Sequence, residues 1–205
     1  GKTIAIDLSS PELIWENFTS NNRNKIRKAI KSGVKVYHGQ YPSIYQTFRQ
    51  IYNTTMDAND ALDYYFFSEE FYNSILNDLK NESCVFWAEL DGKIIAASIF
   101  IAANGFLNYH LSGSLLEYRK YAPTNLLLYE AALWGNTNGY KSLHLGGGLG
   151  SHEDSLYEFK HSFNRNTTHQ FSIGKKIFLA DAYKKLVEVR KLTSSSGFFP
   201  EYRDK

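Results

Sequence analysis

Basic residues are concentrated in one part of this 205-residue chain. Positions 17–56 contain seven basic residues and no acidic one, although the net charge of the whole chain is only +2. They are Arg23, Lys25, Arg27, Lys28, Lys31, Lys35 and Arg49. A local positive surface suits RNA or nucleotide phosphates, and Arg23, Lys25, Arg27 and Lys28 share one predicted helix. A solvated helix face explains the same pattern equally well.

A glycine-rich turn spans residues 146–150, directly after a predicted strand. It is not a Walker loop, because no Gly-Lys-Ser/Thr follows. It is not a dinucleotide-binding loop either, because Ser151 or Glu153 stands where a third glycine is needed. Backbone N–H groups at the start of the following helix are suited to an anion, and an ordinary strand-to-helix turn is the other interpretation.

Other common catalytic arrangements do not match the sequence. The histidines are His38, His110, His144, His152, His161 and His169. They show no ligand spacing with the single cysteine, Cys84, or with a carboxylate cluster, so we expect no metal site. The chain also contains no Gly-x-Ser-x-Gly segment, which argues against a serine hydrolase.

Hydrophobic periodicity predicts the elements that must position these residues. Strands are expected at 3–8, 34–37, 84–90, 93–103, 106–111, 140–145 and 169–173. Helices are expected after Ser10-Pro11, at 21–31, 42–55, 68–79, 123–137 and 180–192, and after a capping box formed by Ser151 and Asp154. The residues 193–197 are typical of a loop, and the aromatic segment 198–203 is not typical of an idle terminus.

Two dipeptides define the centre of the sheet. Asp91-Gly92 and Asn104-Gly105 are strong signals for tight hairpin turns, because their residues tolerate positive φ. Three successive antiparallel strands followed by a helix and a strand indicate a mixed sheet in an α/β arrangement. We therefore expect an α/β fold with a mostly antiparallel central sheet flanked by helices.

Composition limits the size and the setting of the protein. The hydrophobic fraction of 43% is enough for one sizeable core, so we expect one domain over residues 1–205. The most apolar run, 94–103, is too short to span a bilayer, so no stable membrane insertion is expected. A single cysteine permits no intramolecular disulfide, and no secretory leader precedes the first strand. These features predict a cytoplasmic protein.

The region 109–148 resembles the GNAT acyltransferases, in which a strand, a turn, a helix and a strand hold coenzyme A phosphates at the helix N-terminus. The family loop, Gln/Arg-x-x-Gly-x-Gly/Ala, is replaced here by Arg119-Lys120-Tyr121-Ala122-Pro123-Thr124. Both glycines are absent. We expect Ala122 and Thr124 to be unable to adopt the glycine backbone angles or to let a pyrophosphate approach closely, so coenzyme A should bind weakly.

The chain is also similar to the Fem-type transferases, a branch of this superfamily that takes an amino acid from aminoacyl-tRNA. The similarity covers nearly the whole chain. It includes Asn22-Arg23-Asn24-Lys25-Ile26-Arg27-Lys28-Ala29, Asp91-Gly92-Lys93, Tyr109-His110-Leu111-Ser112-Gly113-Ser114, Asn125-Leu126-Leu127-Leu128-Tyr129-Glu130-Ala131, Leu145-Gly146-Gly147 and Phe159-Lys160. Fem-type proteins pair two GNAT-like lobes, and this chain resembles the second, C-terminal lobe of such a longer protein.

The resemblance implies site residues. It places the pair Phe159-Lys160 at the transfer site, where the Lys160 cation would stabilise an oxyanion. By itself, a lysine on a helix is read as a solvated side chain. His110 is a second catalytic candidate, because its strand borders the acyl site of this fold, although a histidine satisfied within the sheet is the alternative. The resemblance implies substrate contacts for Phe159, Tyr109, Ser112, Arg119 and Asn125. A core position on one helix stripe with Leu156 and Phe163 explains Phe159 equally well.

The function implied by the resemblance is transfer of an aminoacyl group from aminoacyl-tRNA to an amine of a peptidoglycan precursor, a nucleotide- or lipid-linked peptide. No cofactor is implied. Two alternatives stay open at this point. One is a GNAT N-acetyltransferase that uses acetyl-CoA or another acyl-CoA, and the other is a basic binding lobe without catalysis.

Overall fold

The computed structural model describes residues 1–190 and 197–204. The described chain forms two compact units, Gly1–Gln170 and Phe171–Lys205. The sequence predicts one domain over residues 1–205, and in the structure the first unit alone contains the whole sheet. Among the described residues, no helix has both the length and the apolar character needed to cross a membrane.

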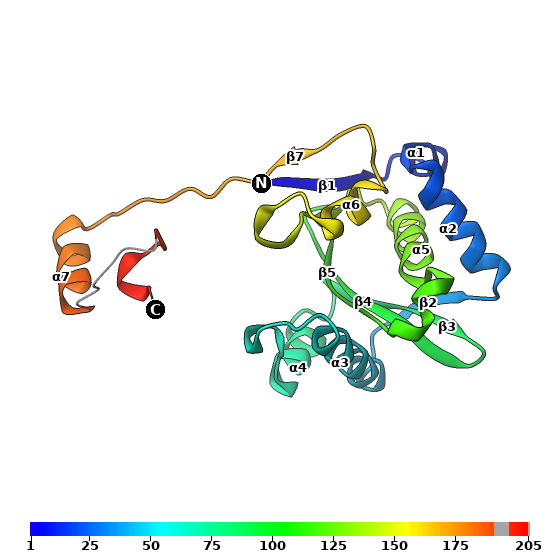
Figure 1. The fold of residues 1–205 in the computed structure, drawn as a ribbon, viewed down its shortest axis with the longest axis horizontal. Coiled ribbons are helices and arrows are strands. Elements are labelled where there is room, and N and C mark those ends of the chain that lie inside the picture. The colour runs from blue at the N-terminus through cyan, green and yellow to red at the C-terminus, as the bar shows by residue number, and fades with distance from the viewer. Residues whose placement is uncertain (191–196, 205) are drawn as a thin grey trace. The chain divides into compact units, whose positions relative to one another are not determined.

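The first unit is built on a seven-stranded sheet with the strand order β2-β3-β4-β5-β6-β1-β7 (Figure 1). The strands are β1 (Lys2–Asp7), β2 (Lys35–Gly39), β3 (Ser83–Leu90), β4 (Lys93–Ala103), β5 (Phe106–Ser114), β6 (Ser142–Gly146) and β7 (His169–Gln170). Every neighbouring pair is antiparallel except β5 and β6, which are parallel. This confirms the predicted mixed, mostly antiparallel sheet.

Both predicted tight turns are present. Asp91 and Gly92 have φ of 50° and 78°, and Asn104 and Gly105 have φ of 53° and 81°. Two consecutive residues with positive φ match the right-handed twist of the flanking strands, which is why these dipeptides favour two-residue hairpins. The turns join β3, β4 and β5 into an antiparallel meander within the sheet.

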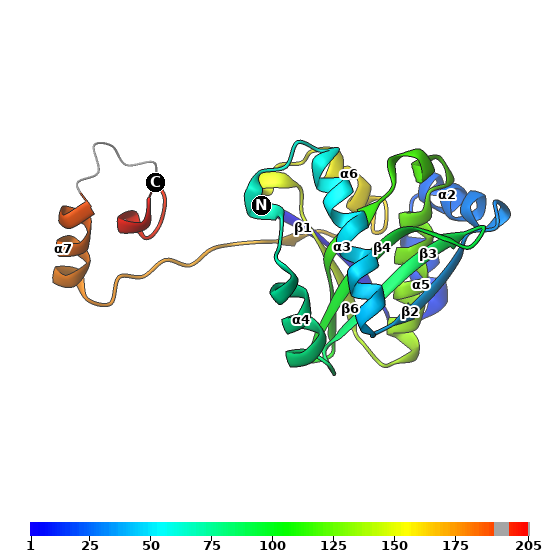
Figure 2. The same ribbon diagram turned by 90° about the horizontal axis from the view of Figure 1, so that it is seen from below.

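Helices cover the two faces of the sheet and bury a separate hydrophobic cluster on each (Figures 1 and 2). One face carries α1 (Pro11–Asn17), α2 (Ser20–Lys31) and α5 (Pro123–Thr137), whose apolar residues pack with those of β1, β3, β4 and β6. The other face carries α3 (Pro42–Asp57) and α4 (Glu69–Asp78). Removal of this apolar surface from water is the main source of stability for the unit.

Two helix starts show side-chain N-caps, and a third corrects a prediction. The side chains of Ser10 and Thr19 accept from backbone N–H groups in the first turns of α1 and α2. The predicted capping box at Ser151 is wrong, because Asp154 is itself the N-cap of α6 (Ser155–His161) and accepts from the Tyr157 N–H. The sequence supplied two oxygen-bearing side chains three residues apart, and the backbone forms the helix from the second.

The last strand is shorter than predicted. β7 ends at Gln170 rather than at residue 173, because it pairs with β1 through only two residue pairs. In the second unit, α7 (Ala180–Arg190) begins where the helix 180–192 was predicted to begin. The predicted end of this helix and most of the predicted loop fall on residues 191–196, which lie outside the described residues. The rings of Phe199 and Tyr202 pack on Tyr183 of α7, with centroid distances of 6.1 and 5.6 Å.

The contact between β5 and α3 leaves no room for a side chain at Gly113. A Cβ there would lie 2.8 Å from Tyr52 Cα and 2.9 Å from Ile51 O, both of which are backbone atoms. We therefore expect Gly113→Ala to destabilise the protein by about 1–3 kcal/mol through overpacking, measured by denaturant unfolding. Gly174→Ala is the control, because a Cβ there meets nothing within 4 Å. Equal stability of the two variants would contradict the close packing.

Candidate active site

The parallel strands β5 and β6 separate after a short ladder. They pair from Phe106 with Ser142 to Asn108 with His144, and β5 then continues beside β4 while β6 continues beside β1. Tyr109 on β5 and Leu145 on β6 are the first residues beyond the last pair. Past this point the two strands are no longer paired with each other.

The glycine run closes the end of β6. A Cβ at Gly147 would collide with the Lys2 carbonyl oxygen, and one at Gly148 would collide with the His152 carbonyl oxygen. Gly146 has a φ of 80°, which favours glycine. The run is required because the chain turns tightly here, between β6 and the Asp154 cap of α6.

Lys160 of α6 reaches back to this turn. Its Nζ donates a 2.7 Å hydrogen bond to the Gly147 carbonyl, and only 9% of the side chain is exposed. Among the described residues, Gly147 is the one hydrogen-bond acceptor recorded for this ammonium group. The interpretation of Lys160 as a solvated surface lysine is therefore wrong.

Burial and one carboxylate set the charge balance at Lys160. Burial lowers the pKa of the ammonium group, and the nearby negative charge of Asp154 opposes that shift. The pKa of Asp154 is itself lowered by the backbone N–H groups of Tyr157 and Leu149, which donate to it at 2.8 and 3.0 Å. Asp154 thus caps α6, anchors the turn and keeps a negative charge near the lysine.

A hydroxyl-bearing cluster lies on β4 and β5. Ser98, which is fully buried, donates a 2.9 Å hydrogen bond to Ser112. The Tyr109 ring packs against the Phe100 ring, and burial raises the pKa of its hydroxyl group, while the hydroxyls of Ser112 and Ser98 oppose the shift. Tyr109 and Ser112 are thus brought together, as neutral hydrogen-bonding groups, along the strand that leaves β6.

Among the described residues, three other predicted site residues have no recorded side-chain contact with Lys160. His110 is exposed at the irregularity in the β4–β5 register, and partial desolvation of its ring lowers its pKa. Arg119 is exposed, and its Nε donates to Ser114 Oγ at 3.3 Å. Phe159 is half-buried, and its ring packs on Phe163 in the core. None of these interactions joins His110 or Arg119 to Lys160.

Asn125 connects three helices. It is buried in the first turn of α5 and donates a 2.8 Å hydrogen bond to Asn22 Oδ1, and Asn22 donates to the Ser162 carbonyl at 3.2 Å. Ser162 directly follows α6, the helix that carries Lys160. The Asn125–Asn22–Ser162 chain therefore fixes the start of α5 and the helix α2 relative to the lysine.

The loop before α5 corrects one prediction. Ala122 ends a 3-10 helix (Leu116–Tyr121) and adopts the left-handed conformation, with φ 53° and ψ 45°. The expectation that Ala122 could not take glycine-like angles is wrong, because the left-handed region costs alanine only about 1–2 kcal/mol and the surrounding structure can supply that. The Cβ atoms of Ala122 and Thr124 remain as differences from the glycine loop.

The basic residues of α2 fall into two groups. Arg23 is half-buried, and its Nη1 donates to the carbonyls of Trp15, Glu16 and Phe18, the closest at 2.7 Å. Arg27 lies 5.2 Å from the centre of the Trp15 ring. Lys25 and Lys28 are exposed. The first group holds α1 against α2, and the second faces solvent.

Sequence reasoning did not single out His144 for this site. Its half-buried ring lies close enough to Lys160 and His169 for their charges to add to burial in lowering its pKa. The available signal was its position between Leu143 and Leu145, which are buried in the core, so that His144 projects to the opposite side. Among the described residues, no group of three or more His, Cys, Asp or Glu side chains could hold a metal ion.

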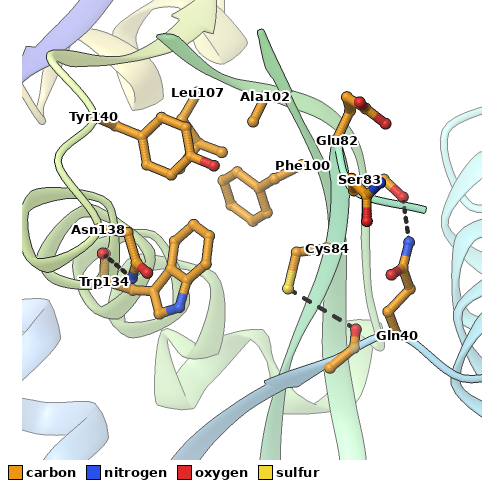
Figure 3. Close-up of a pocket in the computed structure, with 12 residues that line it drawn as sticks. Gln40, Glu82, Ser83, Cys84, Phe100, Ala102, Leu107, Trp134, Asn138 and Tyr140 are labelled. Carbon is orange, nitrogen blue, oxygen red and sulfur yellow. Dashed lines mark hydrogen bonds between the residues drawn. The ribbon is translucent and has the colours of Figure 1, made fainter. Parts of the chain in front are cut away.

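A pocket of about 290 Å³ lies elsewhere, between the end of α5 and the edge formed by β2, β3, β4 and β5 (Figure 3). It is lined in part by Cys84, Phe100, Trp134 and Tyr140, and by none of the predicted site residues. Burial raises the pKa of the Cys84 thiol to about 11, so this thiol is a poor nucleophile at neutral pH. The pocket and the Lys160 site are separate.

Fold and site together define a class. The strand, turn, helix and strand observed between β5 and β6 match the arrangement by which the sequence resembles the GNAT acyltransferases. The profile of the acetyltransferase (GNAT) domain family matches residues 18–161. The chain belongs to the acetyltransferase (GNAT) domain family.

Individual relatives agree with this assignment. The chain is 25% identical to the UDP-N-acetylmuramoylpentapeptide-lysine N(6)-alanyltransferase of Weissella viridescens, over 83% of this chain and 51% of that protein. It therefore spans about half the length of this curated relative. The crystal structure of FemX has a TM-score of 0.69 at 15% identity, covering 82% of this chain and 58% of that one.

A smaller enzyme shows the same fold. An aminoglycoside acetyltransferase from an uncultured soil metagenomic sample has a TM-score of 0.56 at 13% identity, covering 73% of this chain and 99% of that one. At these identities the likeness of solved structures concerns the fold alone.

The buried amide chain supports a stability prediction. Asn125→Ala leaves Asn22 Oδ1 without its donor in a buried setting, so we expect a loss of about 1–3 kcal/mol in unfolding free energy, measured with denaturant. Thr137→Ala is the control, because this exposed residue of α5 bonds only within its own helix. A loss no larger than that of the control would show that the amide chain does not hold the helices together.

Proposed function

We propose that the chain transfers an aminoacyl group from aminoacyl-tRNA to an amine of a peptidoglycan precursor peptide. The observation that carries the proposal is the buried Lys160 ammonium, held at the end of β6 where β5 and β6 separate. One of its three N–H groups is engaged by Gly147, which leaves donors for a substrate oxygen. A preorganised cation in a desolvated site is suited to stabilise developing negative charge.

The proposed chemistry is aminolysis of an ester. The acceptor amine attacks the ester carbonyl of the donor, and the carbonyl oxygen becomes an oxyanion that accepts a hydrogen bond from Lys160. A C–N bond forms and the C–O ester bond breaks. The proton lost by the amine goes to the leaving ribose oxygen, which becomes a hydroxyl group. Tyr109 and Ser112, neutral at ordinary pH, contact the substrate from the β5 side.

The acceptor class is supported by the curated relative. The name of that protein specifies alanyl transfer to the lysine of a UDP-N-acetylmuramoylpentapeptide, a nucleotide-linked precursor peptide. The similarity covers 83% of this chain, which includes the β5, β6 and α6 segments of the site. A peptide amine of a nucleotide- or lipid-linked precursor is therefore the acceptor that we assign.

The donor assignment depends on the basic surface of α2. The exposed lysines Lys25 and Lys28 can contact a phosphate backbone while Arg23 and Arg27 hold the helix in place. An acyl-CoA donor is the second candidate, favoured by the left-handed Ala122, which reproduces a glycine conformation at the start of α5. Transfer from acetyl-CoA but not from aminoacyl-tRNA in one assay would select this alternative.

The catalytic role of Lys160 can be tested directly. In the intact protein, Lys160→Ala should lower the turnover of labelled aminoacyl-tRNA by roughly 100-fold, because an oxyanion donor is lost, while donor affinity is kept. The parent rate should fall on alkalinisation at a pH below the ordinary lysine value of 10.5, because burial lowers the pKa of the group whose charged form acts. Lys141→Ala, at an exposed lysine, is the control. A folded Lys160→Ala variant with normal turnover would leave a binding lobe without catalysis as the better explanation.

The two groups of basic residues should separate experimentally. Replacing Lys25 and Lys28 with alanine should weaken tRNA binding and make its salt dependence less steep by about two counterions, measured by fluorescence anisotropy at several salt concentrations. Arg23→Ala should instead lower the melting temperature, because three backbone carbonyls lose their shared donor. An unchanged salt slope in the double lysine variant would argue against α2 as the RNA surface.

A further inference from the structure

His144 lies at the point where the two parallel strands separate. It pairs with Asn108 in the last pair of the β5–β6 ladder, and on its other side it pairs with Ala5 of β1. Two residues further along β6, a Cβ added at Gly146 would lie 3.3 Å from the Lys160 Nζ atom. Two residues of a strand span about 7 Å, so the histidine and the ammonium group belong to the same end of β6.

The His144 ring is open to a ligand. Leu143 and Leu145 enter the hydrophobic core, so the His144 side chain projects from the other face of the strand, where it is half-buried. Among the described residues, no hydrogen bond to either ring nitrogen and no stacked aromatic ring is recorded. The rings of His38 and His161, by contrast, pack on Phe or Tyr rings. Both nitrogen atoms of His144 are therefore able to contact a substrate.

The surroundings of His144 favour its neutral form. Burial is the largest cause that lowers the pKa of its imidazole, and the charges of His169 on β7 and of Lys160 on α6 lower it further. The strand neighbours on β1 and β5 carry no charge, and Asp7, farther along β1, accepts a hydrogen bond from the backbone N–H of Ser9. At neutral pH the ring is therefore uncharged and has a lone pair that can accept a proton.

The transfer chemistry requires such a group. When an amine attacks an ester carbonyl, its nitrogen becomes positively charged, and it has to lose a proton before a neutral amide can form. The Lys160 ammonium cannot accept that proton, because it acts in its charged form. The group that stabilises the oxyanion and the group that removes the proton therefore have to be different side chains.

We propose that His144 is the general base of the transfer reaction, an assignment that rests on the proposed function. Its ring takes one proton from the attacking amine nitrogen as the C–N bond forms, while the Lys160 ammonium donates to the oxyanion. The imidazolium then gives this proton to the leaving ribose oxygen as the C–O bond breaks, and His144 returns to its neutral form. The positive charge of Lys160 disfavours the imidazolium and so promotes this second proton transfer.

The test is the pH dependence of transfer by the intact protein, with labelled aminoacyl-tRNA as donor and a lysine-containing precursor peptide as acceptor. The parent turnover should fall on acidification through a pH below the ordinary histidine value of 6.5, because protonated His144 cannot accept a proton. His144→Gln should lower kcat about 100-fold, keep the KM for the donor and lose this acid limb. Titration of the acceptor amine is common to all variants, so their difference isolates the histidine.

His169→Gln is the matched control, because this exposed histidine acts on the His144 ring only through its charge. It should keep the parent turnover at neutral pH and move the acid limb to higher pH, since one charge that disfavours the imidazolium is lost. His144→Ala should regain part of its turnover when imidazole is added, which a purely structural role would not produce. The melting temperatures of all three variants should stay close to that of the parent.

A folded His144→Gln variant with the parent turnover and the parent acid limb would overturn the assignment and leave the proposed function intact. Lost turnover with an unchanged acid limb and no rescue by imidazole would also overturn it, because the role would then be structural. A parent protein that transfers from neither aminoacyl-tRNA nor acetyl-CoA would reject the proposed function itself. If the parent uses acetyl-CoA, the same loss in His144→Gln supports the assignment, because the base acts on the acceptor amine.

Discussion

The site depends on the hydrogen bond between the Lys160 ammonium and the Gly147 carbonyl. A buried cation is costly unless it is paired, and here one carbonyl and the nearby charge of Asp154 compensate. The bond requires the chain to turn tightly after β6, at Gly147 and Gly148, where a Cβ atom would strike the backbone. It also requires Asp154 to be the N-cap of α6, because this position of the helix brings Lys160 back to the turn.

The strand pairing of the sheet determines the position of the Lys160 site. One parallel pair in an otherwise antiparallel sheet joins β6 to β5 over three residues only. Beyond Asn108 and His144 the two strands pair with β4 and β1 and no longer with each other. The hydrogen bonds from Asn125 to Asn22 and from Asn22 to Ser162 link the start of α5, helix α2 and the end of α6. Three segments that are far apart in sequence are therefore held together.

Local chemistry made much of the fold predictable. Asp91-Gly92 and Asn104-Gly105 define hairpins because few other dipeptides accept two positive φ values, and the helix 123–137 was predicted to the residue. Tertiary contacts decided the rest. Ala122 adopts a left-handed conformation that its type disfavours, and the partners that occupy Arg23 and Asn125 come from other elements. A pattern of residue types cannot show which polar side chains have hydrogen-bond partners in distant parts of the chain.

The burial of Lys160 could not be predicted from the sequence either. In the sequence, a buried lysine in a short helix looks the same as a solvent-exposed lysine. Only the structure shows that Lys160 is buried at the end of β6. Local rules are broken most often where function requires it.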